Sequence, residues 1–264
     1  MSFKFCSLSS GSSGNCQYIE TNDMRVLVDA GLSGKKTQEL LASIDVDPSS
    51  IDCIFVTHEH MDHVKGAGIL SRRFDIPIYA NKSTWESMEC GLGKLNDENI
   101  KIFDTGCDFE LGDLGILPFK VSHDCSEPVG YSFYNKNKKI SVVTDTGCID
   151  SEIKKTIMNS NLLMIESNHD KDMLKMGSYP WFLKQRVSGE FGHLSNEDAG
   201  NLIAEVLSGK NENILLGHLS RENNFPELAH QTVANILNEK GIDISCDVSL
   251  DLTFRDKATK VYEI

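Results

Sequence analysis

Three histidines and an aspartate lie within six consecutive positions, in a segment that reads Thr-His-Glu-His-Met-Asp-His from Thr57 to His63. An extended backbone places His58 and His60 on the same side of the chain. Asp62 and His63 follow where the chain must turn, so they can face a second point in space. Zinc accepts imidazole and carboxylate ligands, and manganese or iron tolerates the same set. The segment therefore predicts a metal site. The alternative interpretation is a polar loop that happens to be rich in histidine.

The pattern His-x-His-x-Asp-His resembles the signature of the metallo-β-lactamase superfamily. Three later residues, each following an apolar run, resemble the further metal motifs of that superfamily in the expected order: His123, Asp145 and His218. Any of the three alone would more often be a surface or capping residue. Carried over by resemblance, one metal ion is held by His58, His60 and His123, and the other by Asp62, His63 and His218, with Asp145 as the bridge. The resemblance also gives Asp29 a role as a buried carboxylate that orients the histidine segment.

A site of this kind predicts hydrolysis with two divalent metal ions per chain, either zinc or manganese, with iron as a third choice. Two ions about 3.5–4 Å apart lower the pKa of a shared water and hold both oxygens of a phosphodiester. The expected nucleophile is a metal-bridging hydroxide, and we expect the catalytic residues to be Asp62, Asp145 and His193. Cys125 and Cys148 are close to ligands in the sequence, but the ligand set is complete without them, so we expect both to be structural.

Three further stretches resemble the YycJ/WalJ-like subfamily of bacterial proteins. These are Ser9–Cys16, Glu166–Asp170 and a doubled Gly-His-Leu-Ser at Gly192–Ser195 and Gly217–Ser220. The subfamily resembles DNA exonucleases that act from the 5′ end, distantly related to ribonuclease J and ribonuclease Z. The resemblance implies a 5′-to-3′ DNA exonuclease, with DNA or RNA as the bound partner. Only 72 residues separate Asp145 from His218, too few for the large inserted domain of ribonuclease J.

The same stretches supply candidates for contacting the substrate. The turn Ser9–Asn15 is either a simple hairpin or a cradle for a phosphate, because glycine lets the backbone approach a ligand closely. The candidate substrate-binding residues are Ser10, Ser12, Asn15, Asn168, His193 and Ser195. His193 is expected to contact the substrate or protonate the leaving oxygen, the alternative being a histidine that ties down a loop. Ser195 is placed to cap the next helix, whose first turn is acidic and works against a bound anion.

The candidate metal ligands come directly after expected strands, so the arrangement of these strands and of the helices between them decides where the ligands lie. Expected strands come first as hairpins and later alternate with helices, which together with the resemblance predicts an αββα four-layer sandwich in one domain, residues 1–264. Expected helices include Lys35–Ser43, Val64–Phe74, Lys82–Cys90, Ser151–Asn159, Asn196–Leu207 and Phe225–Lys240. Lys171–Gln185 is expected to be irregular or helical. Ile244–Val248 and Val261–Ile264 are expected to be the closing strands.

The composition adds further limits. The formal charge of −13 argues against non-specific binding of nucleic acid through a broad basic surface, yet leaves a nuclease open. The cluster Lys171, Lys175, Lys184 and Arg186 either reinforces a positive site or is a solvated face. With no apolar run of about 20 residues and no signal peptide, we expect a cytoplasmic protein with no membrane partner. Its eight cysteines are then expected to be reduced.

Two other functions fit the same residues. One is a hydrolase that cuts a small cyclic nucleotide, another phosphodiester or a thioester on the same metals. The other is a regulatory protein that binds metal without catalysis and acts through a protein partner. A metal site with an open position and only nitrogen and oxygen ligands disfavours the regulatory protein, because structural zinc sites are usually closed and rich in cysteine.

Overall fold

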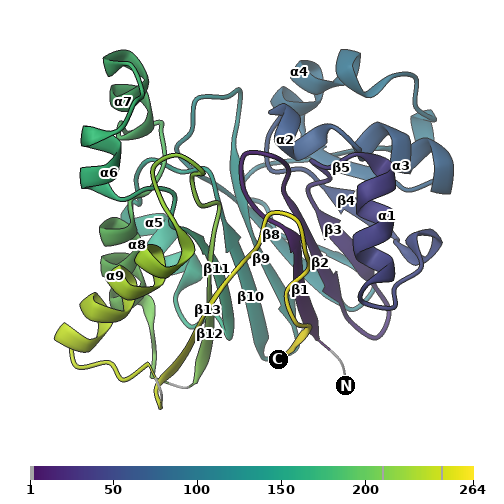
Figure 1. The fold of residues 1–264 in the computed structure, drawn as a ribbon. Helices are drawn as coiled ribbons and strands as arrows, with labels where there is room; N and C mark the ends of the chain where they lie inside the picture. The colour runs from purple at the N-terminus through teal and green to yellow at the C-terminus, as the bar shows by residue number, and fades with distance from the viewer. Residues whose placement is uncertain (1–2, 210, 245) are drawn as a thin grey trace.

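Two seven-stranded sheets pack face to face with helices on both outer sides (Figure 1). The computed structural model describes residues 3–209, 211–244 and 246–264. The αββα four-layer sandwich predicted from the sequence is confirmed. Among the described residues, no helix combines the length and the apolar character that a bilayer-spanning segment needs.

The first sheet is antiparallel at one side and parallel at the other. Its strand order is β14 (Tyr262–Glu263), β1 (Lys4–Ser9), β2 (Cys16–Glu20), β3 (Arg25–Val28), β4 (Cys53–Phe55), β5 (Ile78–Asn81) and β6 (Ile100–Phe103). β14, β1, β2 and β3 pair antiparallel, and β3 to β6 pair parallel. β1, β3 and β4 therefore run in the same direction and end at the same edge of the sheet.

The second sheet repeats this arrangement. Its order is β13 (Val248–Leu252), β12 (Glu212–Gly217), β11 (Leu162–Glu166), β10 (Lys138–Val143), β9 (Val129–Asn135), β8 (Leu114–Lys120) and β7 (Phe109–Leu111). β7 to β10 pair antiparallel and β10 to β13 pair parallel. β8, β10, β11 and β12 run in the same direction, so their carboxyl ends also share one edge.

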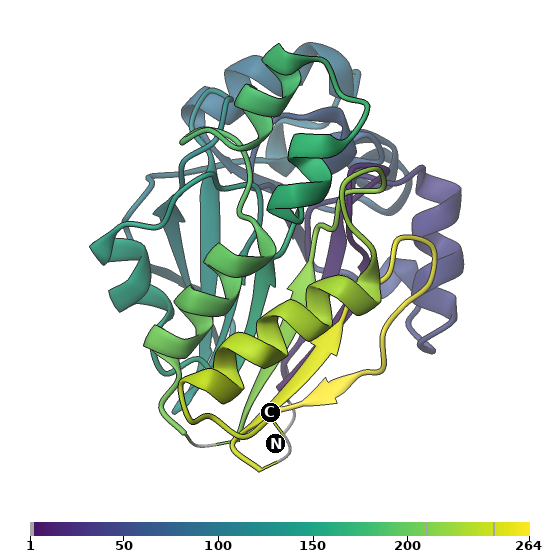
Figure 2. The ribbon, with the colours of Figure 1, turned by 60° about the vertical axis from the view of Figure 1, so that its left-hand side comes forward.

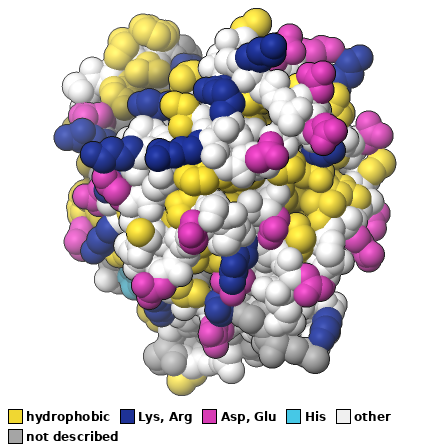
Figure 3. All heavy atoms as spheres, turned by 90° about the vertical axis from the view of Figure 1, so that its right-hand side faces the viewer, with side chains coloured by type: hydrophobic (Ala, Val, Ile, Leu, Met, Phe, Trp, Pro, Cys, Tyr) yellow, Lys and Arg dark blue, Asp and Glu magenta, His cyan; other side chains and the backbone are white. Residues whose placement is uncertain are grey.

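Helices cover the outer face of each sheet. On the first sheet lie α1 (Gly34–Ala42), α3 (Ala67–Phe74) and α4 (Lys82–Leu92), with the short α2 (Met61–Val64) near one edge (Figure 1). Hydrophobic, basic and acidic side chains are mixed over this face (Figure 3). On the second sheet lie α5 (Ser151–Ile157), α8 (Asn196–Val206) and α9 (Pro226–Glu239), of which α8 and α9 cross the strands side by side (Figure 2). α6 (Lys171–Met176) and α7 (Trp181–Val187) stand beyond the strand ends, and two single turns of 3-10 helix are Pro48–Ser50 and Asp97–Asn99.

Three apolar cores separate the four layers, one between the sheets and one under each helical layer. The central core contains Phe55 of β4, whose ring lies 5.6 Å from that of Tyr131 and 5.7 Å from that of Phe133, both on β9. The Tyr131 hydroxyl donates a 2.6 Å hydrogen bond to the Val56 carbonyl. This contact fixes the backbone of the first sheet two residues before His58.

Two expected elements differ from the structure, and a third takes one of its two expected forms. Val64–Phe74 is not one helix but parts of α2 and α3, which separate at Gly66. There the chain lies so close to the loop between β3 and α1 that a Cβ would be 2.3 Å from the Leu32 carbonyl oxygen. Lys171–Gln185, expected to be irregular or helical, is helical: it forms α6 and most of α7, and Pro180 stops a continuous helix between them. The expected strand Ile244–Val248 is wrong: residue 245 lies outside the described part of the chain, and β13 begins at Val248, in register with β12.

Candidate metal centre

The carboxyl ends of parallel strands from both sheets meet at one edge of the sandwich. β3 is followed by Asp29 and β4 by Thr57 and His58, while β10 leads to Asp145, β11 ends at Glu166 and β12 leads to His218. Ligands bind open α/β sheets outside these strand ends. The segment after β8 adds His123 at the same edge.

Three of these strand-end residues have a left-handed backbone. The φ angle is 61° at Asp29, 54° at Asp145 and 52° at His218. Residues other than glycine rarely adopt this conformation, and it concentrates at functional sites. It turns the chain sharply at the end of the strand and aims each side chain across the edge of the sandwich.

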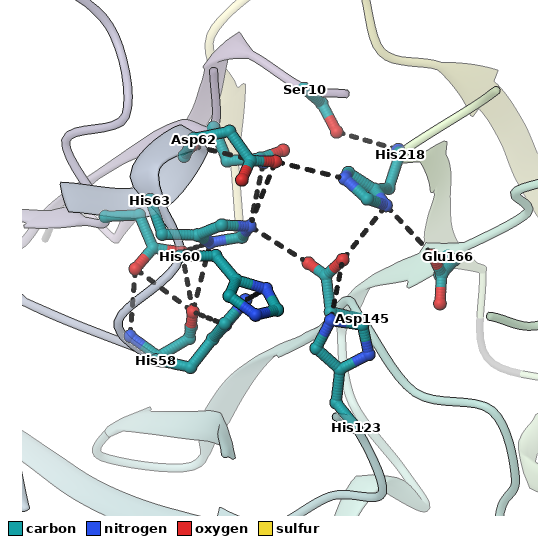
Figure 4. A network of polar contacts seen from close by, with 12 residues as sticks. Ser10, His58, His60, Asp62, His63, His123, Asp145, Glu166 and His218 are labelled. Carbon is teal, nitrogen blue, oxygen red and sulfur yellow. Dashed lines mark hydrogen bonds and ion pairs between the residues drawn. The ribbon is translucent and has the colours of Figure 1, made fainter. Parts of the chain in front are cut away.

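The predicted metal ligands form two groups that meet at Asp145 (Figure 4). In the first group, His58 Nε2 lies 3.1 Å from His60 Nδ1, and the His123 ring centroid is 5.1 Å from that of each. In the second group, Asp62 Oδ2 lies 3.6 Å from His63 Nε2 and 3.8 Å from His218 Nε2. Potential ligand atoms within each group are all within 4.8 Å of one another.

Asp145 lies between the two groups, which suits a residue that contacts two ions. Its Oδ2 is 3.1 Å from His63 Nε2, and its Oδ1 is 3.3 Å from His218 Nδ1 and 3.9 Å from His123 Nε2. Burial opposes ionisation of this carboxyl, but the positive charges of His218 and His63 outweigh it and hold the pKa well below its usual range. The carboxylate is therefore in the form that a cation requires.

Two buried atoms of these groups have no hydrogen-bond partner among the described residues: Asp145 Oδ2 and His218 Nε2. Buried polar atoms are nearly always paired, so such exceptions need an explanation. Both belong to residues of one nitrogen and oxygen donor set, and divalent ions are the natural partners of that set. The residues therefore fit the metal ions that the sequence predicts.

Asp29 and Thr57 hold the histidine segment from behind. Asp29 is fully buried, and its Oδ2 accepts a 2.7 Å hydrogen bond from His63 Nδ1. Its Oδ1 accepts a 2.8 Å bond from the Thr57 backbone amide. A carboxylate on one ring nitrogen fixes the tautomer and leaves the other nitrogen to face the metal. The Gly192 carbonyl does the same for His123, accepting from Nδ1 at 3.2 Å.

Comparison with known proteins agrees with this geometry. A family profile described as "Beta-lactamase superfamily domain" matches residues 24–218. The chain belongs to the metallo-β-lactamase superfamily. It is 43% identical over 264 residues to "Exodeoxyribonuclease WalJ" of Streptococcus pneumoniae, covering 99% of this chain and 98% of that protein. It is also 43% identical over 244 residues to "Exodeoxyribonuclease YycJ" of Bacillus anthracis, covering 92% of each chain. Its fold matches that of the metallo-β-lactamase fold protein YhfI from Bacillus subtilis with a TM-score of 0.77, at 16% identity and full coverage of both chains.

Glu166 contacts two of the candidate site histidines of this metallo-β-lactamase superfamily chain, a place that the sequence analysis did not assign to it. Its side chain is fully buried at the end of β11. Oε1 accepts from His193 Nδ1 at 2.7 Å and from His218 Nδ1 at 2.9 Å, while Oε2 accepts from the backbone amides of Thr146 and Leu194 at 3.0 and 3.4 Å. Burial opposes its ionisation, but the charge of His193 and these hydrogen bonds lower the pKa to about 2. The available signal was its position at the end of an apolar strand, which it shares with Asp29 and Asp145.

His218 has carboxylates around its ring. Burial disfavours the charged imidazole, but Asp145, Asp62 and Glu166 outweigh it and raise the pKa to about 10. A metal ion held by Nε2 would take the place of this proton, so its uptake would release a proton at neutral pH. The backbone amide of His218 also donates to Ser10 Oγ at 2.8 Å, which joins the first loop to the last ligand (Figure 4).

The structure separates the predicted substrate residues into two kinds. Four are buried, and their side chains hydrogen-bond within the protein. Ser10 bonds His218, Asn15 Nδ2 lies 3.0 Å from His63 Nε2, Asn168 Nδ2 donates to the His218 carbonyl at 2.9 Å, and Ser195 caps α8 by accepting from the Asp198 amide. Ser12 is exposed and the His193 side chain is 21% exposed. These two line a pocket of about 290 Å³, whose wall also includes the buried Asn168 together with His218, Tyr179 and Arg221.

Proposed function

We propose that this chain is a metal-dependent exodeoxyribonuclease that uses two divalent ions. The observation that carries the proposal is the 43% identity to WalJ over 99% of the chain, since that relative is named an exodeoxyribonuclease. The two ligand groups that meet at Asp145 support two ions rather than one. Zinc and manganese both suit the donor set.

Two bound ions would supply positive charge at the scissile phosphate and lower the pKa of a water between them. His58, His60 and His123 would hold one ion and Asp62, His63 and His218 the other, with Asp145 contacting both. Asp29 and Glu166 hold the ligand rings in the tautomers that leave a nitrogen free for metal. The catalytic role of Asp62 and Asp145 is thus to fix the ions and, through them, the attacking water.

His193 is the group that we assign to the leaving oxygen. Glu166 accepts from its Nδ1, which orients the ring and stabilises its charged form. Nε2 then carries the proton that can pass to the departing 3′ or 5′ oxygen. The partial exposure of the side chain and its place in the pocket beside His218 support a contact with substrate rather than a purely structural role.

The 5′-to-3′ direction is a second part of the proposal. Ser12 and Ser13 are both exposed in the Ser9–Asn15 turn, and Ser12 lines the pocket beside His218 together with Arg221. A phosphate held by Ser12 and Arg221 beside the metal centre would place the first internucleotide bond at the metals.

The test is a screen of purified protein with manganese or zinc against 5′-phosphorylated DNA, RNA, bis-p-nitrophenyl phosphate and a thioester. End-labelled DNA should be shortened stepwise from the 5′ end, and a blocked 5′ end should slow the reaction. Equal cleavage of circular and linear strands would indicate an endonuclease. Hydrolysis of the thioester or of the small diester alone would overturn the proposal.

A further inference from the structure

A second pocket, of about 290 Å³, adjoins the metal centre between α6, α7 and the start of α8. His193 lines both this pocket and the one that His218 lines, so the two pockets share its side chain as part of their walls. The proposed function uses only the pocket beside His218. The remaining lining of the second pocket includes Lys175, Trp181 and Lys184.

The charge of this region is opposite to that of the whole chain. Residues 171–187 contain four basic residues and one acidic residue, a formal +3, whereas the chain carries −13. Lys171 and Lys175 are four apart on α6, so both can face the pocket. Lys171 pairs with Asp198 at 3.0 Å and Lys184 donates to the Lys175 carbonyl at 2.7 Å. Lys175 Nζ has no ion pair with the residues that the structure describes, so it is available to an anion.

Trp181 supplies an aromatic face. It is 70% exposed although it is a large apolar side chain, and it lines the pocket three residues before Lys184 on the same side of α7. Proteins that hold single-stranded nucleic acid combine cations for the backbone with aromatic rings on which bases stack. Trp181 beside Lys175 and Lys184 provides this combination.

His169 is a further, independent sign of a ligand. It lines the same pocket and is 2% exposed, yet its Nδ1 has no hydrogen-bond partner among the described residues. A buried ring nitrogen left unpaired at a pocket wall can hydrogen-bond a polar group that enters the pocket. A nucleobase edge or a phosphate oxygen carries such groups.

We propose that this pocket binds one nucleotide of a DNA strand next to the scissile phosphate, with its base stacked on Trp181 and its phosphate at Lys175. The proposal rests on the proposed nuclease function. Its volume is near the lower end of the range of about 300–1,000 Å³ for small-molecule sites, which suits a single nucleotide rather than a longer segment.

The kinetic test compares Trp181→Ala with Phe182→Ala. Phe182 is the next residue on α7 and is equally exposed, at 70%, but it does not line the pocket. Trp181→Ala should raise KM for a DNA oligonucleotide by about 5- to 150-fold, the effect of losing one stacked base. Its kcat/KM for DNA should fall relative to that for bis-p-nitrophenyl phosphate. Phe182→Ala should leave this ratio at the wild-type value.

A charge-matched pair tests the phosphate contact. Lys175→Ala should raise KM for the oligonucleotide and reduce its dependence on salt, because one phosphate contact is lost. Lys155→Ala removes the same charge from the exposed side of α5 and should change neither. The proposed nucleotide pocket would be overturned if the two variants of either pair, Trp181→Ala with Phe182→Ala or Lys175→Ala with Lys155→Ala, had equal effects. It would also be overturned if Trp181→Ala had no effect.

Fluorescence separates this pocket from the nuclease proposal. The chain has two tryptophans, of which Trp85 is 4% exposed and Trp181 is 70% exposed. Thymidine 5′-monophosphate should quench the wild-type emission, and Trp181→Phe should abolish the quenching. Quenching by a protein that does not digest DNA would refute the nuclease and keep the pocket. Digestion of DNA without quenching would keep the nuclease and refute the pocket.

Discussion

Replacement of Glu166 by glutamine should weaken both metal binding and folding. The carboxylate accepts four hydrogen bonds, two from imidazoles on Oε1 and two from backbone amides on Oε2. Glutamine has the same shape, but one of its two terminal groups is an amide NH₂ that cannot accept. Whichever way the amide turns, two buried donors lose their acceptor.

The two orientations have different consequences. If the oxygen stays with the imidazoles, the NH₂ faces the amides of Thr146 and Leu194. If the side chain flips, the NH₂ donates to His218 Nδ1, which moves the ring proton to Nε2 and blocks the nitrogen that a metal would use. Each unpaired buried donor costs about 1–3 kcal/mol. A total of about 3 kcal/mol would lower the Tm of the metal-free protein by roughly 6–12 °C. Loss of a residue that orients a metal ligand lowers metal affinity by about 10- to 100-fold.

The assay pairs thermal unfolding without metal with a zinc or manganese titration of the Glu166→Gln protein. Glu205→Gln is the control, because it removes the same charge from an exposed ion pair with Lys154. It should change Tm and metal affinity little, because exposed ion pairs contribute little to stability. Wild-type Tm together with wild-type metal affinity in Glu166→Gln would refute the reasoning.

Three further predictions concern single residues. His193→Ala should keep both metal ions but lose most turnover, whereas His218→Ala should lose metal as well; metal analysis beside DNA digestion checks both, and full turnover of folded His193→Ala would assign that residue to the scaffold. Asp145→Ala should loosen both ions and abolish hydrolysis, and finding one tightly bound ion in saturated wild-type protein would contradict the two-metal site. Burial lowers the pKa of His169 to about 4, against about 6.5 when unfolded. The folded state thus resists protonation, so the contribution of His169 to stability should be complete above pH 6.5 and should be lost, by about 3 kcal/mol in total, as the pH drops through 4; denaturant unfolding should show a smaller loss in His169→Gln.

Much of the metal centre follows from sequence because its residues obey one local rule. A ligand-type side chain comes where an apolar strand stops, as at Asp145 and His218, and parallel strands bring those ends to one edge. The role of Glu166 obeys the same rule but was missed, because a carboxylate that contacts two histidines from behind is defined only by packing between β10, β11 and β12. The same limit applies to Ser10. Its hydroxyl bonds an amide 208 residues away, which no local pattern reveals.

Helix boundaries show another limit. The periodicity of Val64–Phe74 is compatible with one helix, and the break at Gly66 arises from the carbonyl of Leu32, which belongs to a distant part of the sequence. The pocket at Trp181 could likewise not be predicted from the sequence. The lysines around it were recognised as a cluster, but only the arrangement of α6 and α7 places them on one cavity next to His193.

The left-handed backbone at Asp29, Asp145 and His218 has a consequence for protein engineering. Each side chain is held in a conformation that costs about 1 kcal/mol or more and that glycine adopts freely. At Asp29, glycine would also remove the acceptor of the Thr57 amide and of His63 Nδ1. A library sorted only for heat resistance of the metal-free protein would therefore favour glycine at Asp145 and His218 but not at Asp29. The same library sorted for hydrolysis would reject those variants. Selection for thermal stability and selection for hydrolysis thus favour different residues at these strand ends. Stabilising mutations should therefore be sought in the helical layers instead.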